Sequence, residues 1–340
     1  MNFYPPPPVI QAQVLFRIPD SLRCAGQPTE WRGGFAGPSS DIFLEGPVSG
    51  PDGVLHLVDI PYGRILRADL NKPDDERMVT ECVRYDGEPN GLALLDNGRL
   101  VVADYKQVAI PYLLNPCTHR SRRAEANSRP QGILKFDPVT NEITPLLTRR
   151  NLERFKGPND LIVASNGDIY FTDQGQTGLT DPTGCVYRLS PNGKLDILVS
   201  NGISPNGLAL SPDERFLYVA MTRANSVWRL PLHTDGTTTK VGLFFQSFGN
   251  AGPDGLAVDE EGNVLICHPS LGSVFVVDSE GLPKARIVTA PEGGKNLTNC
   301  CFGGEDGRTL FITDSMKGNV QYVRWHCAGM EWIKSKSRNS

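Results

Sequence analysis

A polar residue followed by a short apolar run recurs six times along this chain of 340 residues. One copy reads Pro205-Asn206-Gly207-Leu208-Ala209-Leu210. Successive polar openers are separated by 45, 69, 47, 48 and 45 residues. The six openers are Glu45, Asn90, Asn159, Asn206, Asp254 and Asn299. A repeat of about 45 residues that contains several short strands is typical of a propeller blade.

Each repeat follows the same order of strands and turns. In the copy that begins at Asp254, the apolar run is followed by the turn Glu260-Glu261-Gly262 and by two further runs, 264–266 and 274–277. Short β-branched or aromatic runs between Gly, Asn and Asp residues predict strands, and we find no sustained helical periodicity. We therefore predict an all-β protein, a six-bladed β-propeller with a central channel, formed by residues 1–340 as a single domain.

Some segments fall outside the regular repeat. Residues 1–12 are rich in proline and are expected to be extended. A strand at 13–17 is expected to complete the last blade, because an open sheet edge invites aggregation. Residues 105–131 lengthen the second repeat, and we predict that they form a lid, since long loops on a rigid scaffold often carry function. Residues 333–340 are read as a polar tail.

The composition of the chain limits the kinds of molecule that it is expected to bind. The net charge of −4 does not favour binding to nucleic acid or to an anionic membrane, and no apolar stretch is as long as a membrane span. The N-terminus lacks the basic start and apolar core of a signal peptide. Eight cysteines occur without a CxxC pair and are expected to be reduced. We therefore expect a cytoplasmic protein that acts on a small molecule, and the sequence does not predict its oligomeric state.

The polar openers are candidates for a metal site. In a propeller the innermost strand of each blade lines the channel, so openers at the same register would form a ring at one mouth. Asn and Asp after Pro also serve as turn residues, which is the structural alternative. A mixture of carboxylates and carboxamides at one register favours coordination of a hard cation such as Ca²⁺, Mg²⁺ or Mn²⁺. Zn²⁺ is an alternative, although it normally recruits His or Cys.

A second marker follows each opener by fourteen positions, at the predicted end of the second strand. Carboxylates at this register are expected to bind backbone amides, and a histidine there is more often structural than catalytic. Two of these residues are nevertheless candidates for the pocket. Together with two openers and one loop residue they make up the predicted substrate-binding set: Asn90, Asp104, Gln174, His268 and Asn299.

Four phrases occur in a fixed order between about residues 40 and 325: Glu45-Gly46-Pro47, Gly157-Pro158-Asn159-Asp160-Leu161, Ser204-Pro205-Asn206-Gly207 and Gly252-Pro253-Asp254-Gly255. In this order and spacing the chain resembles the gluconolactonase/regucalcin (senescence marker protein-30-like) family of six-bladed propellers. The resemblance implies one divalent cation, Ca²⁺ foremost, with Mg²⁺, Mn²⁺ or Zn²⁺ as alternatives. The implied ligands are Glu45, Asn159, Asn206 and Asp254.

The resemblance also implies a lactonase, which opens a cyclic ester. A cation in this position would polarise the carbonyl and lower the pKa of a bound water, and Asp254 is the candidate general base. The phrase Thr172-Asp173-Gln174-Gly175 departs from the Thr-Asp-Pro-x-Tyr-Gly of many bacterial members, which places the sugar-lactone specificity in question.

Two other functions are compatible with the sequence. One is a non-hydrolytic metal-pocket enzyme of secondary metabolism that carries out a cyclisation, dehydration or cycloaddition on the same scaffold. The other is a non-enzymatic binding propeller, because a fold does not fix a function.

Overall fold

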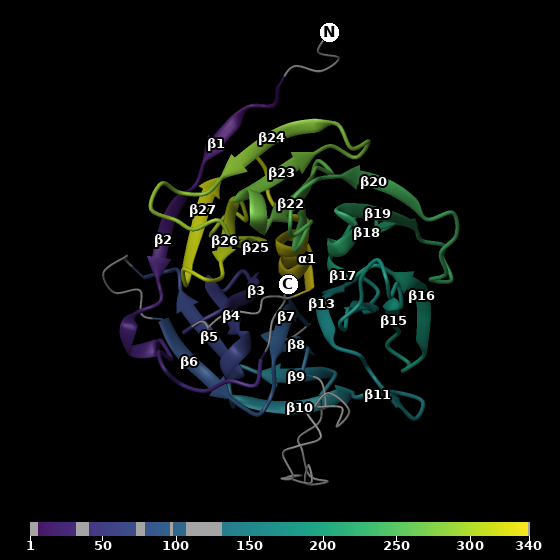
Figure 1. Cartoon of the computed structure of the whole chain (residues 1–340), viewed down its shortest axis with the longest axis horizontal. Helices are drawn as coiled ribbons and strands as arrows, with labels where there is room; N and C mark the ends of the chain where they lie inside the picture. The colour runs from purple at the N-terminus through teal and green to yellow at the C-terminus, as the bar shows by residue number, and fades with distance from the viewer. Residues whose placement is uncertain (1–5, 32–40, 73–78, 96–97, 107–130, 339–340) are drawn as a thin grey trace.

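The computed structural model of the chain describes residues 6–31, 41–72, 79–95, 98–106 and 131–338. Within these residues six sheets of four or five strands surround a central axis, as Figure 1 shows. The predicted all-β, six-bladed propeller is therefore confirmed. The predicted lid lies outside the described residues, apart from Tyr105, Lys106 and Gln131 at its ends.

Each blade contains consecutive strands joined by antiparallel pairing. The first three blades consist of β3 (Leu44–Ser49), β4 (Val54–Asp59), β5 (Arg64–Asp69) and β6 (Val79–Arg84); β7 (Pro89–Leu94), β8 (Leu100–Asp104), β9 (Ile133–Asp137) and β10 (Glu142–Leu147); and β13 (Pro158–Val163), β14 (Ile169–Asp173), β15 (Gly184–Leu189) and β16 (Leu195–Gly202). A small hairpin, β11 (Arg149–Arg150) and β12 (Glu153–Arg154), lies between the second and third blades in sequence.

The remaining blades follow the same plan. They consist of β17 (Pro205–Leu210), β18 (Phe216–Met221), β19 (Ser226–Pro231) and β20 (Gly242–Gln246); β21 (Leu256–Val258), β22 (Val264–His268), β23 (Ser273–Val277) and β24 (Pro283–Val288); and β25 (Leu297–Gly303), β26 (Thr309–Asp314) and β27 (Asn319–Arg324). Short 3₁₀ turns occur at η1 (Asp20–Leu22), η2 (Ile60–Tyr62), η5 (Thr222–Ala224) and η6 (Pro269–Leu271).

The core of the protein lies between the blades. The described part of the chain forms six apolar clusters, and each joins two consecutive blades, the sixth and first included. At that last interface Leu44 and Leu57 pack with Phe311 and Val320. Because each blade is buried on both faces, burial of apolar surface holds the ring closed all the way round.

The N-terminal segment closes the ring by pairing with strands of the last two blades. β2 (Gln13–Arg17) pairs antiparallel with β27, so the strand predicted at 13–17 is confirmed as the outer strand of the last blade. A second strand, β1 (Val9–Gln11), was not predicted, and it pairs in parallel with β24 of the preceding blade. The two strands cover two neighbouring sheet edges that would otherwise offer unpaired backbone groups.

The chain ends in a helix where the sequence suggested only a polar tail. Helix α1 (Met330–Arg338) lies near the centre of the ring in Figure 1. Its Trp332 is buried, and Lys334 forms an ion pair with Glu214 at 2.6 Å. A narrow cavity separates α1 from inner-strand residues such as Val163 and Phe302, so the helix closes one end of the channel. No helix among the described residues has the length and apolarity needed to cross a membrane.

Candidate metal centre

The polar openers coincide with irregularities in the inner strands. Pairing between the first and second strands shifts register just after Glu45, after Pro158 and after Pro205. A β-bulge breaks the strict alternation of side chains and can re-aim one of them. The bulges therefore explain how polar side chains can leave the pleat at the beginning of strands that are otherwise apolar and buried.

The openers are withdrawn from bulk solvent. Glu45 and Asn159 are each 5% exposed, and Asn90, Asn206 and Asn299 are also buried. Asp254, which precedes β21, keeps partial contact with solvent although protein surrounds its carboxyl group. The six openers therefore offer buried oxygen atoms, and Asp254 is the most exposed of the six residues.

Three carboxyl groups share this buried space. Burial raises the pKa of Glu45 to about 7, and the charge of Asp160 contributes to the increase. Burial, followed by the charges of Glu45 and Asp160, holds the pKa of Asp254 well above its usual range. The Asn206 side chain hydrogen-bonds Asp254, and Thr298 and Asn299 do the same for Glu45. Openers from different blades are thus in direct contact.

Asp160 is the member of this group that sequence analysis missed. The residue after the opener is glycine in four blades, because the next blade approaches closely there; a Cβ on Gly91, for example, would lie 2.7 Å from Asp160 Cα. The third blade has Asp160 at this register instead. Its Oδ1 accepts a hydrogen bond from the Leu161 N–H at 2.8 Å, and Asn299 Nδ2 lies 3.5 Å from its Oδ2. The sequence feature that could have revealed Asp160 is the replacement of Pro-Asn-Gly by Pro-Asn-Asp in the third repeat.

The residues fit a divalent cation. Burying several carboxylates together is costly unless a positive charge compensates for them. Arg223 is the cationic side chain that opposes the raised pKa of Asp254, and it is exposed and contributes least. Carboxylate and carboxamide oxygens are the donors preferred by Ca²⁺ and Mg²⁺.

Residues 43–316 match the profile of the SMP-30/Gluconolactonase/LRE-like region. The chain belongs to this family. A gluconolactonase of Zymomonas mobilis is 38% identical over 216 residues, which cover 58% of this chain and 59% of that protein. The chain thus spans about three fifths of the length of this relative.

Two solved structures have the same fold as this SMP-30/gluconolactonase-like protein. A gluconolactonase from Xanthomonas campestris superposes with a TM-score of 0.64 at 26% identity, covering 83% of this chain and 86% of that one. Regucalcin from Agrobacterium tumefaciens, described as a calcium-binding protein, gives a TM-score of 0.66 at 20% identity and covers 95% of this chain and 96% of that one.

In this SMP-30/gluconolactonase-like protein, the carboxylates fourteen positions after the openers bind backbone amides. Asp104 Oδ1 accepts hydrogen bonds from the N–H groups of Glu88 at 3.0 Å and Lys106 at 2.9 Å. Asp173 likewise accepts from Lys156 and Gly157. Asp104 is 0% exposed. Its contacts are therefore structural, and its predicted contact with a substrate stays a prediction without support from them.

His268 is also held by the protein. It is 0% exposed, its Nε2 lies 3.2 Å from Ser247 Oγ, and burial lowers its pKa. Its ring packs edge-on against Phe275. These contacts make His268 a neutral core residue, and a role in substrate binding stays a prediction.

The other predicted substrate-binding residues lie at or beside the openers. Asn299 Nδ2 faces Asp160, and its Oδ1 accepts a hydrogen bond from the Cys300 N–H at 2.8 Å. Gln174 is bound to Asn159: Asn159 Nδ2 donates to Gln174 Oε1 at 2.9 Å. Asn90 is buried at the start of β7. Their contact with a substrate stays a prediction.

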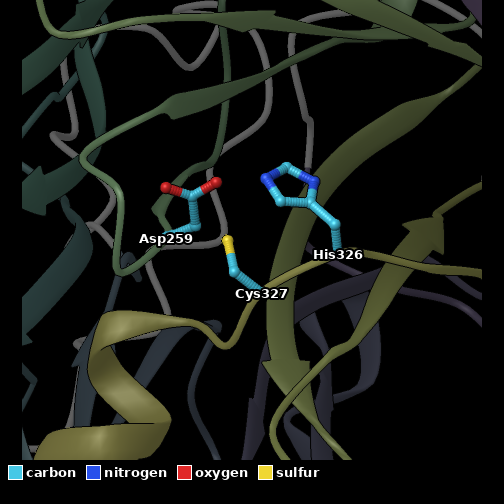
Figure 2. Close-up of side chains that lie close together, drawn as sticks. All are labelled: Asp259, His326 and Cys327. Carbon is cyan, nitrogen blue, oxygen red and sulfur yellow. The ribbon is translucent and has the colours of Figure 1, made fainter.

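A separate group of ligand-type side chains consists of Asp259, His326 and Cys327. Figure 2 shows the three side chains pointing toward one another, and their ligand atoms lie within 4.8 Å of each other. Asp259 follows β21 whereas Asp254 precedes it, so the two carboxylates flank opposite ends of the same inner strand.

Asp259 in this second group already has a full set of hydrogen bonds. Its Oδ1 accepts from the N–H groups of Glu261 and Asn263, and its Oδ2 accepts from Asn263 Nδ2 and Trp325 Nε1 at 2.8 and 2.9 Å. Four donors occupy the lone pairs that a carboxylate offers. We therefore assign Asp259 a structural role, joining the turn after β21 to the C-terminal segment.

Proposed function

We propose that this protein is a divalent-metal-dependent lactonase. The observation that carries the proposal is the cluster of buried carboxyl groups, Glu45, Asp160 and Asp254, beside the carboxamide of Asn206. The name of the 38% identical relative, a gluconolactonase, supports this class of reaction. The proposed substrate is a small cyclic ester.

We assign the cation to Glu45, Asn159, Asn206 and Asp254. Ca²⁺ is the preferred ion because every donor is an oxygen atom, and the structural similarity to a calcium-binding regucalcin supports this choice. When bound, a divalent cation polarises an ester carbonyl and lowers the pKa of a water ligand. The identity of the ion is part of the proposal.

The side chains of the chain itself have separate proposed roles. Asp254 accepts the proton of the attacking water, and its remaining solvent contact supports that role. Asn206 hydrogen-bonds Asp254 and orients its carboxylate. Glu45, hydrogen-bonded by Thr298 and Asn299, is a ligand and not a base. Asp160 adds negative charge beside both carboxylates.

The test compares the wild-type protein with Asp254→Asn and with Asp235→Asn, whose carboxyl group is exposed on a turn. Bound metal is measured by mass spectrometry, and hydrolysis is followed on a panel of sugar, aliphatic and aromatic lactones. We expect metal-dependent turnover that is lost in Asp254→Asn and kept in Asp235→Asn. Undiminished turnover in Asp254→Asn would contradict the assigned base, and bound metal without turnover in the wild type would favour a non-hydrolytic enzyme.

A further inference from the structure

The carboxamide of Asn159 is held by a glutamine that follows the next strand. Asn159 lies in β13, and Gln174 comes directly after β14. Asn159 Nδ2 donates a hydrogen bond to Gln174 Oε1 at 2.9 Å. Because the amide nitrogen is engaged by Gln174, Oδ1 is the atom of this carboxamide that is free to serve a cation.

The hydrogen bonds continue beyond Gln174 with a consistent direction. Gln174 Nε2 donates to Ser204 Oγ at 2.9 Å. If the Gln174 amide were reversed, its nitrogen would face the nitrogen of Asn159, and two donors would oppose each other. In the direction that the structure shows, Gln174 engages Asn159 Nδ2 and leaves Asn159 Oδ1 for a cation.

Gln174 is itself fixed by the backbone around it. Its N–H donates to Gly157 O at 3.0 Å, and its carbonyl oxygen accepts from Thr177 Oγ1 at 2.6 Å. Thr177 Oγ1 also accepts from the Ser204 N–H at 3.2 Å. The loop is therefore joined both to the segment before Asn159 and to Ser204.

Ser204 connects this network to a second opener. It adopts a positive φ of 59° and is followed directly by Pro205 and Asn206. A residue other than glycine in this conformation must be held by its surroundings. Hydrogen bonds from Gln174 to the Ser204 hydroxyl and from the Ser204 N–H to Thr177 supply part of that restraint.

We propose that Gln174 is a positioning residue that orients the cation ligands of two blades, Asn159 directly and Asn206 through Ser204. This inference rests on the proposed function. Under this proposal Gln174 contacts the cation ligand Asn159, and not a substrate as the sequence suggested. Hydrogen bonds to metal ligands typically account for 10–100-fold in metal affinity or activity.

The experiment measures Ca²⁺ binding by calorimetry on the 340-residue chain after treatment with a chelator. Gln174→Met keeps the length of the side chain and removes both hydrogen bonds. Gln174→Glu keeps the acceptor for Asn159, accepts from the Ser204 hydroxyl, and adds a charge that favours a cation. Gln176→Met is the matched control, because Gln176 lies in the same loop, is exposed, and bonds the Tyr105 hydroxyl.

We expect Gln174→Met to weaken Ca²⁺ binding by about 10–100-fold, as is typical for loss of a hydrogen bond to a ligand. Gln174→Glu and Gln176→Met should bind at least as tightly as the wild type. Thermal midpoints in chelator separate this effect from a loss of folding.

Two results would overturn this inference and leave the proposed function intact. One is wild-type Ca²⁺ affinity in Gln174→Met. The other is an equal loss of Ca²⁺ affinity in Gln174→Met and Gln174→Glu together with a lower thermal midpoint. A wild-type protein that binds no divalent cation would remove both the proposed function and this inference.

Discussion

The Thr172 hydroxyl group donates a hydrogen bond to the backbone carbonyl oxygen of Asn206 at 2.8 Å, across the boundary between the third and fourth blades. The same hydroxyl oxygen accepts a hydrogen bond from the Asp160 N–H at 3.1 Å. One buried side chain at the end of β14 therefore fixes the backbone of two residues of the candidate centre.

The contact recurs at other blade boundaries. Thr222 Oγ1 donates to Pro253 O at 2.8 Å, and Ser315 Oγ donates to Leu44 O at 2.6 Å. In each case the hydroxyl group lies within the last two residues of a second strand or directly after it, and the acceptor lies beside or within the opener of the next blade. The register of one blade is thereby transmitted to its neighbour.

Replacing Thr172 with valine should destabilise the protein. The side chain keeps its shape, but the Asn206 carbonyl and the Asp160 N–H lose a partner in a buried position. Such losses cost about 1–3 kcal/mol. Urea unfolding monitored by tryptophan fluorescence measures the change, with the exposed Thr180→Val as control. A change equal to that of Thr180→Val would show that the contact contributes nothing.

Neutralising Asp160 should raise the stability of the protein without metal and lower it, relative to the wild type, with metal bound. In the presence of a chelator at pH 7.5, Asp160→Asn should unfold at higher denaturant than the wild type, because one of three crowded carboxylates is gone. The gain is on the order of 1–3 kcal/mol.

With saturating Ca²⁺ the wild type should gain more stability than Asp160→Asn, since tighter binding to the folded state raises its stability further. Asp196→Asn, at a partly exposed position on β16, serves as the control. The same order of stability in both conditions would argue against a cation beside Asp160.

His56 should make stability depend on pH. It lies in β4 and is 6% exposed, and burial lowers its pKa from 6.5 to about 4; Asp52 acts in the opposite direction and Arg67 in the same direction, with smaller effects. Between these two values the unfolded chain binds more protons than the folded protein. Stability is therefore retained above about pH 6.5 and falls as the pH is lowered toward 4, by up to about 3 kcal/mol.

The test of the His56 effect is a comparison of two variants across this pH range. His56→Gln should show a shallower loss of unfolding free energy between pH 6.5 and 4 than the wild type. His233→Gln, at an exposed position, should keep the wild-type slope. Identical slopes in His56→Gln and the wild type would contradict the prediction.

The close approach of inner strands makes Gly207 irreplaceable by alanine. A Cβ there would overlap the Asp254 carbonyl oxygen and lie 2.5 Å from Gly255 Cα. Overpacking of this kind costs about 1–3 kcal/mol, and the backbone shift would also move Asp254. Gly242→Ala is the control, since among the described residues none except its chain neighbours comes within 4 Å of its Cβ position. The midpoint temperature of thermal unfolding and the affinity for Ca²⁺ should both fall in Gly207→Ala. Both should stay unchanged in Gly242→Ala.

The repeat predicted the blades because strands, turns and openers occur in the same order in each copy. The outer strand at 13–17 followed from the need to close a sheet edge. β1 could not be predicted in this way, since three residues pair in parallel with β24 far along the chain. Helix α1 was missed because its nine residues are stabilised by packing of Trp332 on the ring and not by a long periodic pattern.

The site was predicted only in outline. Polar openers can be read from the chain, but contacts between blades cannot. Asp160 occupies the register of a glycine found in four other copies and was not among the predicted site residues, whereas Gln174 was predicted to bind a substrate. The cytoplasmic location and the absence of nucleic-acid and membrane partners stay predictions, as does the role of residues 105–131.

The pairing of β2 with β27 has a consequence for biosynthesis. Gln13 lies opposite Tyr322, so the last blade forms only after residues as far as Tyr322 have left the ribosome. Glu45 and Asp254 come from blades on either side of this final joint in the chain, with the last blade between them. A nascent chain would thus carry the proposed ligands before β27 exists to close the ring that holds them, so we expect the proposed cation to bind only after β27 has been made.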